Sequence, residues 1–220
     1  MPVTVVILLT VAAGATDALS FLALGRVFSS VMTGNTVLLG IAVGEGRPAP
    51  VLHAGAALAG YSAGTVVATR LGRTGEGRPT KWRTLVALAA ELFVLTSVLT
   101  GWLAALGRPS GRLQVALLAL AAAAMGAQSA TVNAFPGPKQ PTTRLTGTIT
   151  GLLGSLAAGL GSGGRSRGAG ALLALLAGAA ACAALLAYAR LLAPLLAPGV
   201  LVLALVRQVM AGMAPERVRG

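Results

Sequence analysis

Charged and reactive side chains are scarce in this 220-residue chain. Only 10% of its residues are charged, five are acidic, and there is one cysteine and one histidine. The single cysteine, Cys182, excludes an internal disulfide and a cysteine metal cluster. The single aspartate, Asp17, cannot supply the pair that an intramembrane aspartyl hydrolase needs, and no nucleophile motif surrounds His53. We therefore predict no enzyme, no cofactor and no metal site.

Long uncharged apolar runs take up most of the chain. Hydrophobic residues make up 55% of it, and its mean hydropathy of +0.83 is too high for an ordinary soluble domain. About 20 apolar residues cross a hydrocarbon core about 30 Å thick, and backbone groups in lipid are satisfied within helices. The sequence predicts an all-α integral membrane protein with six spans, at 3–25, 48–71, 83–106, 112–134, 168–189 and 193–212.

The net charge of +12 comes from 17 basic residues, all of them in loops or at the ends of the apolar runs. Basic residues in this arrangement are the topogenic signal of membrane loops, which face anionic headgroups. A nucleic-acid surface is therefore not expected. The lipid bilayer is the predicted partner of these side chains.

Two further apolar runs, 27–44 and 145–162, are short and polar, which is typical of bent or re-entrant segments that line a cavity. If both cross the membrane, there are eight spans and the 17 basic residues divide eight against nine. If both return to the side they came from, six spans remain and the division is twelve against five. Positive-inside bias favours six spans with both termini in the cytoplasm.

Three local features predict details of the bundle. Gly60 and Gly64 are spaced for close helix approach. Trp82 and Trp102 lie twenty residues apart, about 30 Å along a helix, and are expected at the two membrane interfaces. The Gly/Ser/Arg segment 161–168 is expected to form a loop.

Short motifs in both halves resemble the YoaK family, bacterial integral membrane proteins of unknown function. In the first half these are Asp17-Ala18, Ser20-Phe21-Leu22, Phe28 and Met32-Thr33-Gly34-Asn35. In the second half they are Gly126-Ala-Gln128-Ser129 and Thr142-Thr143-Arg144-Leu-Thr146-Gly147, where Ser129 and Arg144 depart from the family pattern. The resemblance implies a multi-pass protein of the bacterial inner membrane and no known activity.

The two halves also resemble one another. The stretch from Thr33 to Gly40 matches that from Thr146 to Gly154 with one insertion. In a chain this rich in alanine and glycine, a coincidental match remains the alternative. Three spans in each half is an odd number, so the halves, 1–110 and 111–220, are predicted to be inverted repeats.

Polar residues inside the apolar runs form the candidate functional site. Asp17 is read as a proton or cation site or as a contact for a polar solute, and the alternative is a structural carboxyl that caps a helix or bonds nearby hydroxyls. Glu91 has the same two interpretations. The Thr-Gly segments are interpreted as part of the pathway, and the alternative for them is close helix packing by small residues. The predicted pathway residues are Asp17, Thr33, Gly34, Asn35, Glu91, Gln128, Thr146, Gly147 and Thr148.

These features predict a secondary transporter or permease for a small solute or ion, with a polar site near the midplane. A passive channel explains the same features without coupling, and a non-transporting scaffold needs only the small-residue packing. No phosphate-binding Gly-Lys-Ser/Thr motif is present, so ATP-driven transport by this chain is not expected. The sequence names neither substrate nor coupling ion, and it leaves a homo-oligomer open.

Overall fold

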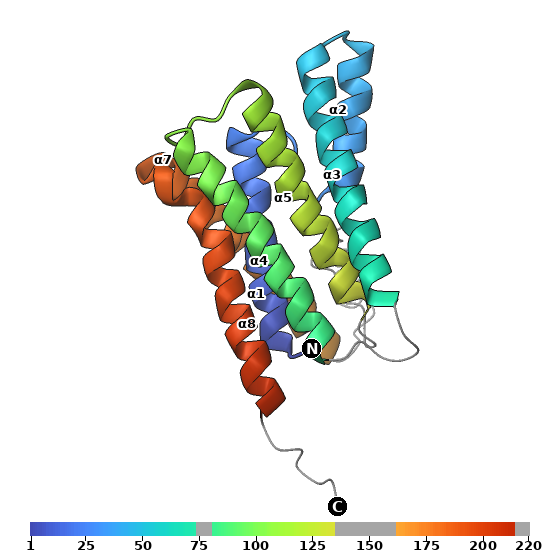
Figure 1. Cartoon of the computed structure of the whole chain (residues 1–220), viewed down its shortest axis with the longest axis vertical. Helices are drawn as coiled ribbons and strands as arrows, with labels where there is room; N and C mark the ends of the chain where they lie inside the picture. The colour runs from blue at the N-terminus through green and yellow to red at the C-terminus, as the bar shows by residue number, and fades with distance from the viewer. Residues whose placement is uncertain (74–80, 135–161, 214–220) are drawn as a thin grey trace, which may run out of the picture.

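A computed structural model of the chain describes residues 1–73, 81–134 and 162–213 (Figure 1). Every regular element in these three ranges is helical. In chain order the elements are α1 (Val3–Ala23), α2 (Met32–Gly44), α3 (Pro48–Arg73), α4 (Lys81–Ala104), α5 (Gly111–Asn133), α7 (Ser162–Tyr188), the 3-10 helix η1 (Arg190–Leu195) and α8 (Leu196–Met213).

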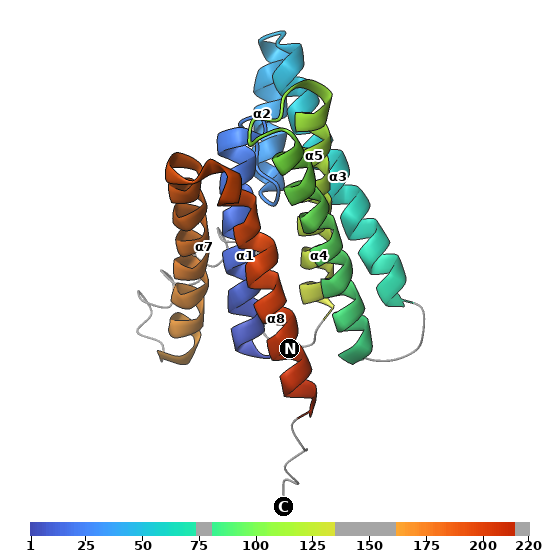
Figure 2. The same cartoon turned by 60° about the vertical axis from the view of Figure 1, so that its left-hand side comes forward.

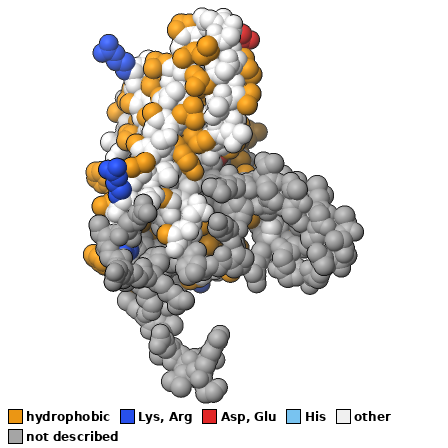
Figure 3. All heavy atoms as spheres, turned by 90° about the vertical axis from the view of Figure 1, so that its right-hand side faces the viewer, with side chains coloured by type: hydrophobic (Ala, Val, Ile, Leu, Met, Phe, Trp, Pro, Cys, Tyr) orange, Lys and Arg blue, Asp and Glu red, His pale blue; other side chains and the backbone are white. Residues whose placement is uncertain are grey.

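Within the described ranges, six helical segments are long and apolar enough to cross a membrane. They are α1, α3, α4, α5, α7 and the segment that η1 and α8 form together. Large apolar side chains such as Phe93 and Leu176 are exposed on them, as a surface in contact with lipid requires. Figure 3 shows one face of the molecule with hydrophobic side chains spread across it. The predicted all-α, six-span membrane fold is confirmed.

Helix α1 lies inside the bundle, where it packs against α7 and α8. Helix α3 packs along α5, and α2 packs against α3, so these two form the edge of the molecule seen at the upper right of Figure 1. Helix α4 contacts both α5 and α8. The buried core between them is made of aliphatic side chains that include Leu9, Leu88, Leu118, Met125 and Leu201.

Helices α3 and α5 approach one another closely at glycines. A methyl group on Gly64 would collide with the carbonyl oxygen of Ala123, and one on Gly126 would collide with that of Tyr61. Gly60 faces the α5 backbone in the same way. The close approach predicted from the spacing of Gly60 and Gly64 is therefore present, and α5 contributes a glycine of its own.

Helices α1 and α7 form a second pair of this kind. A methyl group on Gly14 would collide with the carbonyl oxygen of Leu175, and one on Gly178 would collide with that of Val11. In lipid, helices associate through close packing of this sort because apolar side chains gain little by leaving a hydrocarbon solvent. Close contacts at glycines thus join α3 to α5 in one part of the bundle and α1 to α7 in another.

One predicted detail is wrong, and one residue has partners that the sequence did not indicate. Helix α7 begins at Ser162, so nearly all of the segment 161–168 is helical and not a loop. At a membrane surface an unpaired backbone costs more than the low helix propensity of glycine. Trp102 lies two residues before the end of α4, and its depth in the membrane stays a prediction. Its side chain is 0% exposed, and its Nε1–H donates to the carbonyl of Arg190 at 3.1 Å. The Arg190 guanidinium carbon lies 5.5 Å from the Trp102 ring centroid, so protein groups satisfy this indole.

Candidate functional site

The carboxylate of Asp17 holds the loop that follows α1. Its Oδ1 accepts hydrogen bonds from the backbone N–H of Ser29 at 2.8 Å, the Ser29 hydroxyl at 2.8 Å and the backbone N–H of Ser30 at 2.7 Å. Its Oδ2 accepts a bond from the Ser30 hydroxyl at 2.5 Å. All three residues are buried. Because the loop's polar groups would otherwise lack partners in apolar surroundings, these four bonds fix the loop against α1.

Asn35 holds the same loop from the other side. Its Oδ1 accepts the backbone N–H of Phe28 at 2.9 Å, and its Nδ2 donates to the Phe28 carbonyl at 2.6 Å. The amide therefore pairs with both backbone groups of one residue. The ring of Phe28 also stacks on Phe21 of α1, with centroids 5.0 Å apart. We call Asp17, Ser29, Ser30, Phe28 and Asn35 the loop clamp.

The loop clamp sets the course of α2. Asp17 lies six residues before the end of α1 at Ala23, which is about 9 Å along the helix axis. The loop therefore turns back into the bundle before α2 begins at Met32. Helix α2 then runs to Gly44 at the end of the molecule where α1 finishes (Figure 2). This is the course predicted for the first short polar run, a segment that returns to the side it came from.

Glu91 is a buried carboxyl in the interior of the bundle. Its side chain is 2% exposed, and its Oε1 has no hydrogen-bond partner among the described residues. Seven and eleven residues further along α4, on the same helix face, lie the buried side chains of Val98 and Trp102. A buried carboxyl without a partner lowers stability, so a functional role is the first hypothesis for such a group at membrane depth.

Gln128 of α5 lies at the same depth as Glu91. It is fully buried; its Nε2 donates to the carbonyl of Leu9 at 3.1 Å, while its Oε1 lacks a partner among the described residues. Gly101 of α4 lies against the Leu117 side chain of α5. Glu91 lies ten residues before Gly101 on α4, and Gln128 lies eleven residues after Leu117 on α5. Because the two helices are antiparallel, both residues lie in the same direction from that contact, at about 15 Å and 16 Å along the helix axes. Two neighbouring helices thus carry an unpaired polar oxygen at one level.

The other predicted site residues are spread more widely. Thr33 is exposed, and Gly34 lies near the side chains of Val31 and Phe28 at the start of α2. Thr146, Gly147 and Thr148, with the whole short run 145–162, lie outside the described residues. That these residues line one pathway stays a prediction.

Sequence reasoning missed the partners of the residues that it singled out. Ser29 and Ser30 supply all the donors to Asp17, and only the general polarity of 27–44 pointed toward them. Gln114 was missed as well: its Nε2 donates to the carbonyl of Ala23 at 3.2 Å and ties α5 to the end of α1. A lone amide near the start of an apolar run was the available signal.

His53 lies near the start of α3. Its Nδ1 is 2.7 Å from the carbonyl oxygen of Ala49, and its ring lies against Gly25. Gly25 has a φ of 129°, so both its conformation and the closeness of the ring require glycine there. Among the residues that the structure describes, no three His, Cys, Asp or Glu side chains come together as a metal site.

Comparison with known proteins places the chain in a family. Over 94 residues it is 40% identical to the UPF0700 transmembrane protein YoaK of Bacillus subtilis (strain 168), a match that spans 42% of this chain and 41% of that protein. No solved structure matches. Residues 5–207 match the family described as Protein of unknown function (DUF1275). The YoaK-like resemblance is confirmed, and the chain belongs to the DUF1275 family of proteins of unknown function.

Proposed function

We propose that this protein is a secondary transporter or permease for a small solute or ion, built from two inverted halves. The observation that carries the proposal is the mirrored packing of α1 with α7 and of α3 with α5. Inverted repeats that meet inside the membrane are a recurring architecture of secondary transporters. The contact of Gly14 (α1) with Leu175 (α7) corresponds to that of Gly126 (α5) with Tyr61 (α3). In the same way, the contact of Gly178 (α7) with Val11 (α1) corresponds to that of Gly64 (α3) with Ala123 (α5).

The residue numbers in the corresponding contacts differ by constant amounts. Each contact residue in α5 has a number 112 higher than the corresponding residue in α1, and each one in α7 has a number 114 higher than the corresponding residue in α3. Helices α1 and α5 run in opposite directions, as do α3 and α7 (Figure 2), which is the relation expected of inverted halves. Four backbone contacts that obey two offsets are harder to attribute to composition than short motif matches are. They support the division into 1–110 and 111–220.

Glu91 and Gln128 are the residues we propose for contact with the solute or ion. Both side chains are buried, both carry an oxygen without a partner among the described residues, and both lie at one depth. We assign Asp17 to the loop clamp because its carboxylate already accepts four hydrogen bonds. The Thr-Gly segments 33–35 and 146–148 would contribute hydroxyls and bare backbone to the pathway from the two halves.

The protein would lie in the bacterial plasma membrane with both termini in the cytoplasm, as the basic residues favour. Its partners are then the lipid bilayer and the transported solute, with no nucleic acid and no catalytic centre. A homo-oligomer is compatible with this function and is not required by it.

Reconstitution into proteoliposomes tests the proposal. Uptake of a panel of small metabolites and ions would be measured for the wild type, for Glu91→Gln and for Glu45→Gln, an acid at the end of α2 paired with Arg47. We expect uptake by the wild type and by Glu45→Gln, with loss in Glu91→Gln. Accumulation against a gradient distinguishes a transporter from a passive channel. Absence of uptake for every solute would favour the scaffold alternative.

A further inference from the structure

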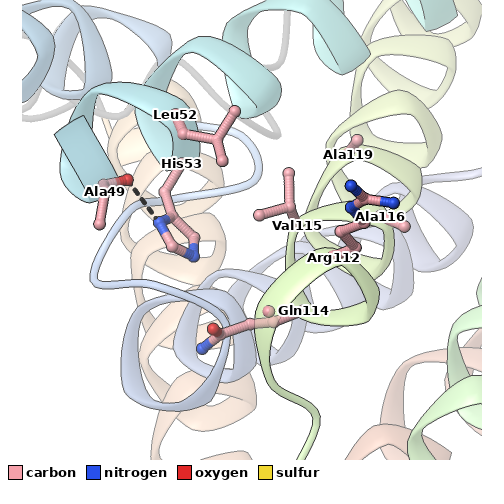
Figure 4. A pocket seen from close by; sticks show the side chains of 9 residues that line it. Ala49, Leu52, His53, Arg112, Gln114, Val115, Ala116 and Ala119 are labelled. Atoms are coloured by element: carbon pink, nitrogen blue, oxygen red, sulfur yellow. Dashed lines mark hydrogen bonds between the residues drawn. The ribbon is translucent and has the colours of Figure 1, made fainter.

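A cavity of about 780 Å³ opens between the first turns of α3 and α5 (Figure 4). It is bordered neither by the loop clamp nor by the proposed transport residues Glu91 and Gln128. The side chains that define its chemistry are Leu52 and His53 from α3, and Arg112, Val115 and Ala119 from α5.

The wall of this cavity is mostly apolar, and its polar side chains are Arg112, His53 and Gln114. Leu52, Val115 and Ala119 present only carbon to it. Arg112 is exposed, and within the described ranges no acceptor is found for its guanidinium. In Figure 4 the Arg112 side chain runs along α5 beside Ala116 and Ala119. Arg112 is the second residue of a membrane span, so its guanidinium is less hydrated than one in bulk water. A bound anion therefore stabilises it more than it would stabilise an arginine in solution.

The start of α5 adds to the positive character of the site. Its first backbone N–H groups, at positions 111–113, have no intrahelical acceptor and carry partial positive charge. Helix α3 adds little, because Pro48 and Pro50 in its first turn have no N–H. His53 adds no free donor through its Nδ1, which lies 2.7 Å from the carbonyl oxygen of Ala49 within the same helix. The complementary ligand for this end of the cavity is therefore an anion.

Depth decides what kind of anion fits. Arg112 is the second residue of its span, and Ala119 lies seven residues further on, about 10 Å deeper in the membrane. The Arg112 backbone thus lies near the membrane surface, its guanidinium lies beside the first part of the apolar wall, and the wall continues deeper along α5. An anionic phospholipid has the same order of groups along the membrane normal, whereas a small free anion would leave the apolar wall uncovered.

We propose that this cavity binds one anionic phospholipid, with the phosphate at Arg112 and an acyl chain along Val115 and Ala119. The lipid would cover the apolar wall and supply the acceptors that the guanidinium lacks. It would also bridge α3 and α5 at the end where they begin. The inference uses none of the residues assigned to transport and does not rest on that function.

Native mass spectrometry of the full chain, purified in neutral detergent with equal amounts of phosphatidylglycerol and phosphatidylcholine, tests the proposal. We expect one retained phosphatidylglycerol on the wild type and about tenfold weaker retention on Arg112→Gln, because a charge-assisted contact is removed. Arg108→Gln is the matched control: Arg108 is an exposed arginine in the preceding loop, outside the cavity. It should retain the lipid.

A second variant keeps the proposal testable if Arg112→Gln fails to fold. Val115→Phe fills the apolar part of the cavity and leaves the guanidinium in place, so it too should lose the retained lipid. Three results would overturn the proposal: equal retention of both lipids by the wild type, equal losses in Arg108→Gln and Arg112→Gln, or Arg112-dependent thermal stabilisation by inorganic phosphate, which would make the ligand a free anion.

Discussion

Ser30 binds Asp17 twice, through its backbone N–H to Oδ1 at 2.7 Å and through its hydroxyl to Oδ2 at 2.5 Å. Ser29 donates two further bonds to the same carboxylate. The carboxylate therefore fixes a loop whose two serines lie twelve and thirteen residues further along the chain. Any solute at Asp17 would compete with that loop for the carboxylate oxygens. The polar residue that stands out most in the first span is thus engaged in building the fold around it.

We expect Asp17→Asn to lower the melting temperature of the purified protein, with a loss of about 2–4 kcal/mol in unfolding free energy, because an amide cannot replace all the charge-assisted bonds. Ser30→Ala removes one hydroxyl and should cost about 1–2 kcal/mol. Thermal unfolding in detergent measures both. Ser62→Ala, at an exposed serine on α3, is the control. Wild-type stability of Asp17→Asn would show that the loop clamp contributes little.

Glu91 should behave in the opposite way. Glu91→Leu replaces a buried carboxyl, which has no partner among the described residues, with an apolar side chain of similar size. We therefore expect stability to rise by about 1–3 kcal/mol while transport is lost. Glu91→Gln should keep the fold and also lose transport. Melting temperature and proteoliposome uptake, measured on the same preparations, test the prediction. A Glu91→Leu protein that unfolds more easily than the wild type would contradict the view that this carboxyl lacks a structural partner.

The membrane spans could be predicted from sequence because they depend on length and polarity alone. A helix in lipid satisfies its own backbone, so each apolar run of sufficient length gives a span regardless of its neighbours. The close approach at Gly60 and Gly64 was accessible for a similar reason, since small residues four apart create a groove on any helix. These are local properties that the sequence expresses directly.

The partners of polar residues could not be predicted, because they depend on which segments meet in space. Asp17 could be recognised as costly in hydrocarbon, but Ser29 and Ser30 become its donors only through the turn of the loop. Trp102 could be recognised as an amphipathic side chain near a span end, but its hydrogen-bond partner, the carbonyl of Arg190, could not. Similarly, nothing in the sequence places Glu91 and Gln128 at one depth; that follows from the register between α4 and α5.

The mirrored glycine contacts predict matched effects in the two halves. Gly64→Ala in α3 and Gly178→Ala in α7 should each destabilise by about 1–3 kcal/mol, because a methyl group meets a backbone carbonyl that cannot yield. Gly55→Ala and Gly170→Ala, in the same two helices, have open space at the added methyl and should be neutral or slightly stabilising. Thermal unfolding of the four variants measures this. Equal effects of all four would contradict the packing.

The course of α2 separates the six-span arrangement from one in which the first short run crosses the membrane. If α2 returns to the side where α1 ends, Arg26 and Gly46 lie on the same side of the membrane; if it crosses, they lie on opposite sides. In a Cys182→Ala background, we expect Arg26→Cys and Gly46→Cys both to react with an impermeant maleimide in intact cells, because positive-inside bias places the other end in the cytoplasm. Trp82→Cys, at the start of α4 and 72% exposed in the wild type, should react only after permeabilisation. Labelling of only one of the first two from outside would show that α2 crosses, and the loop clamp would then lie within a seventh span.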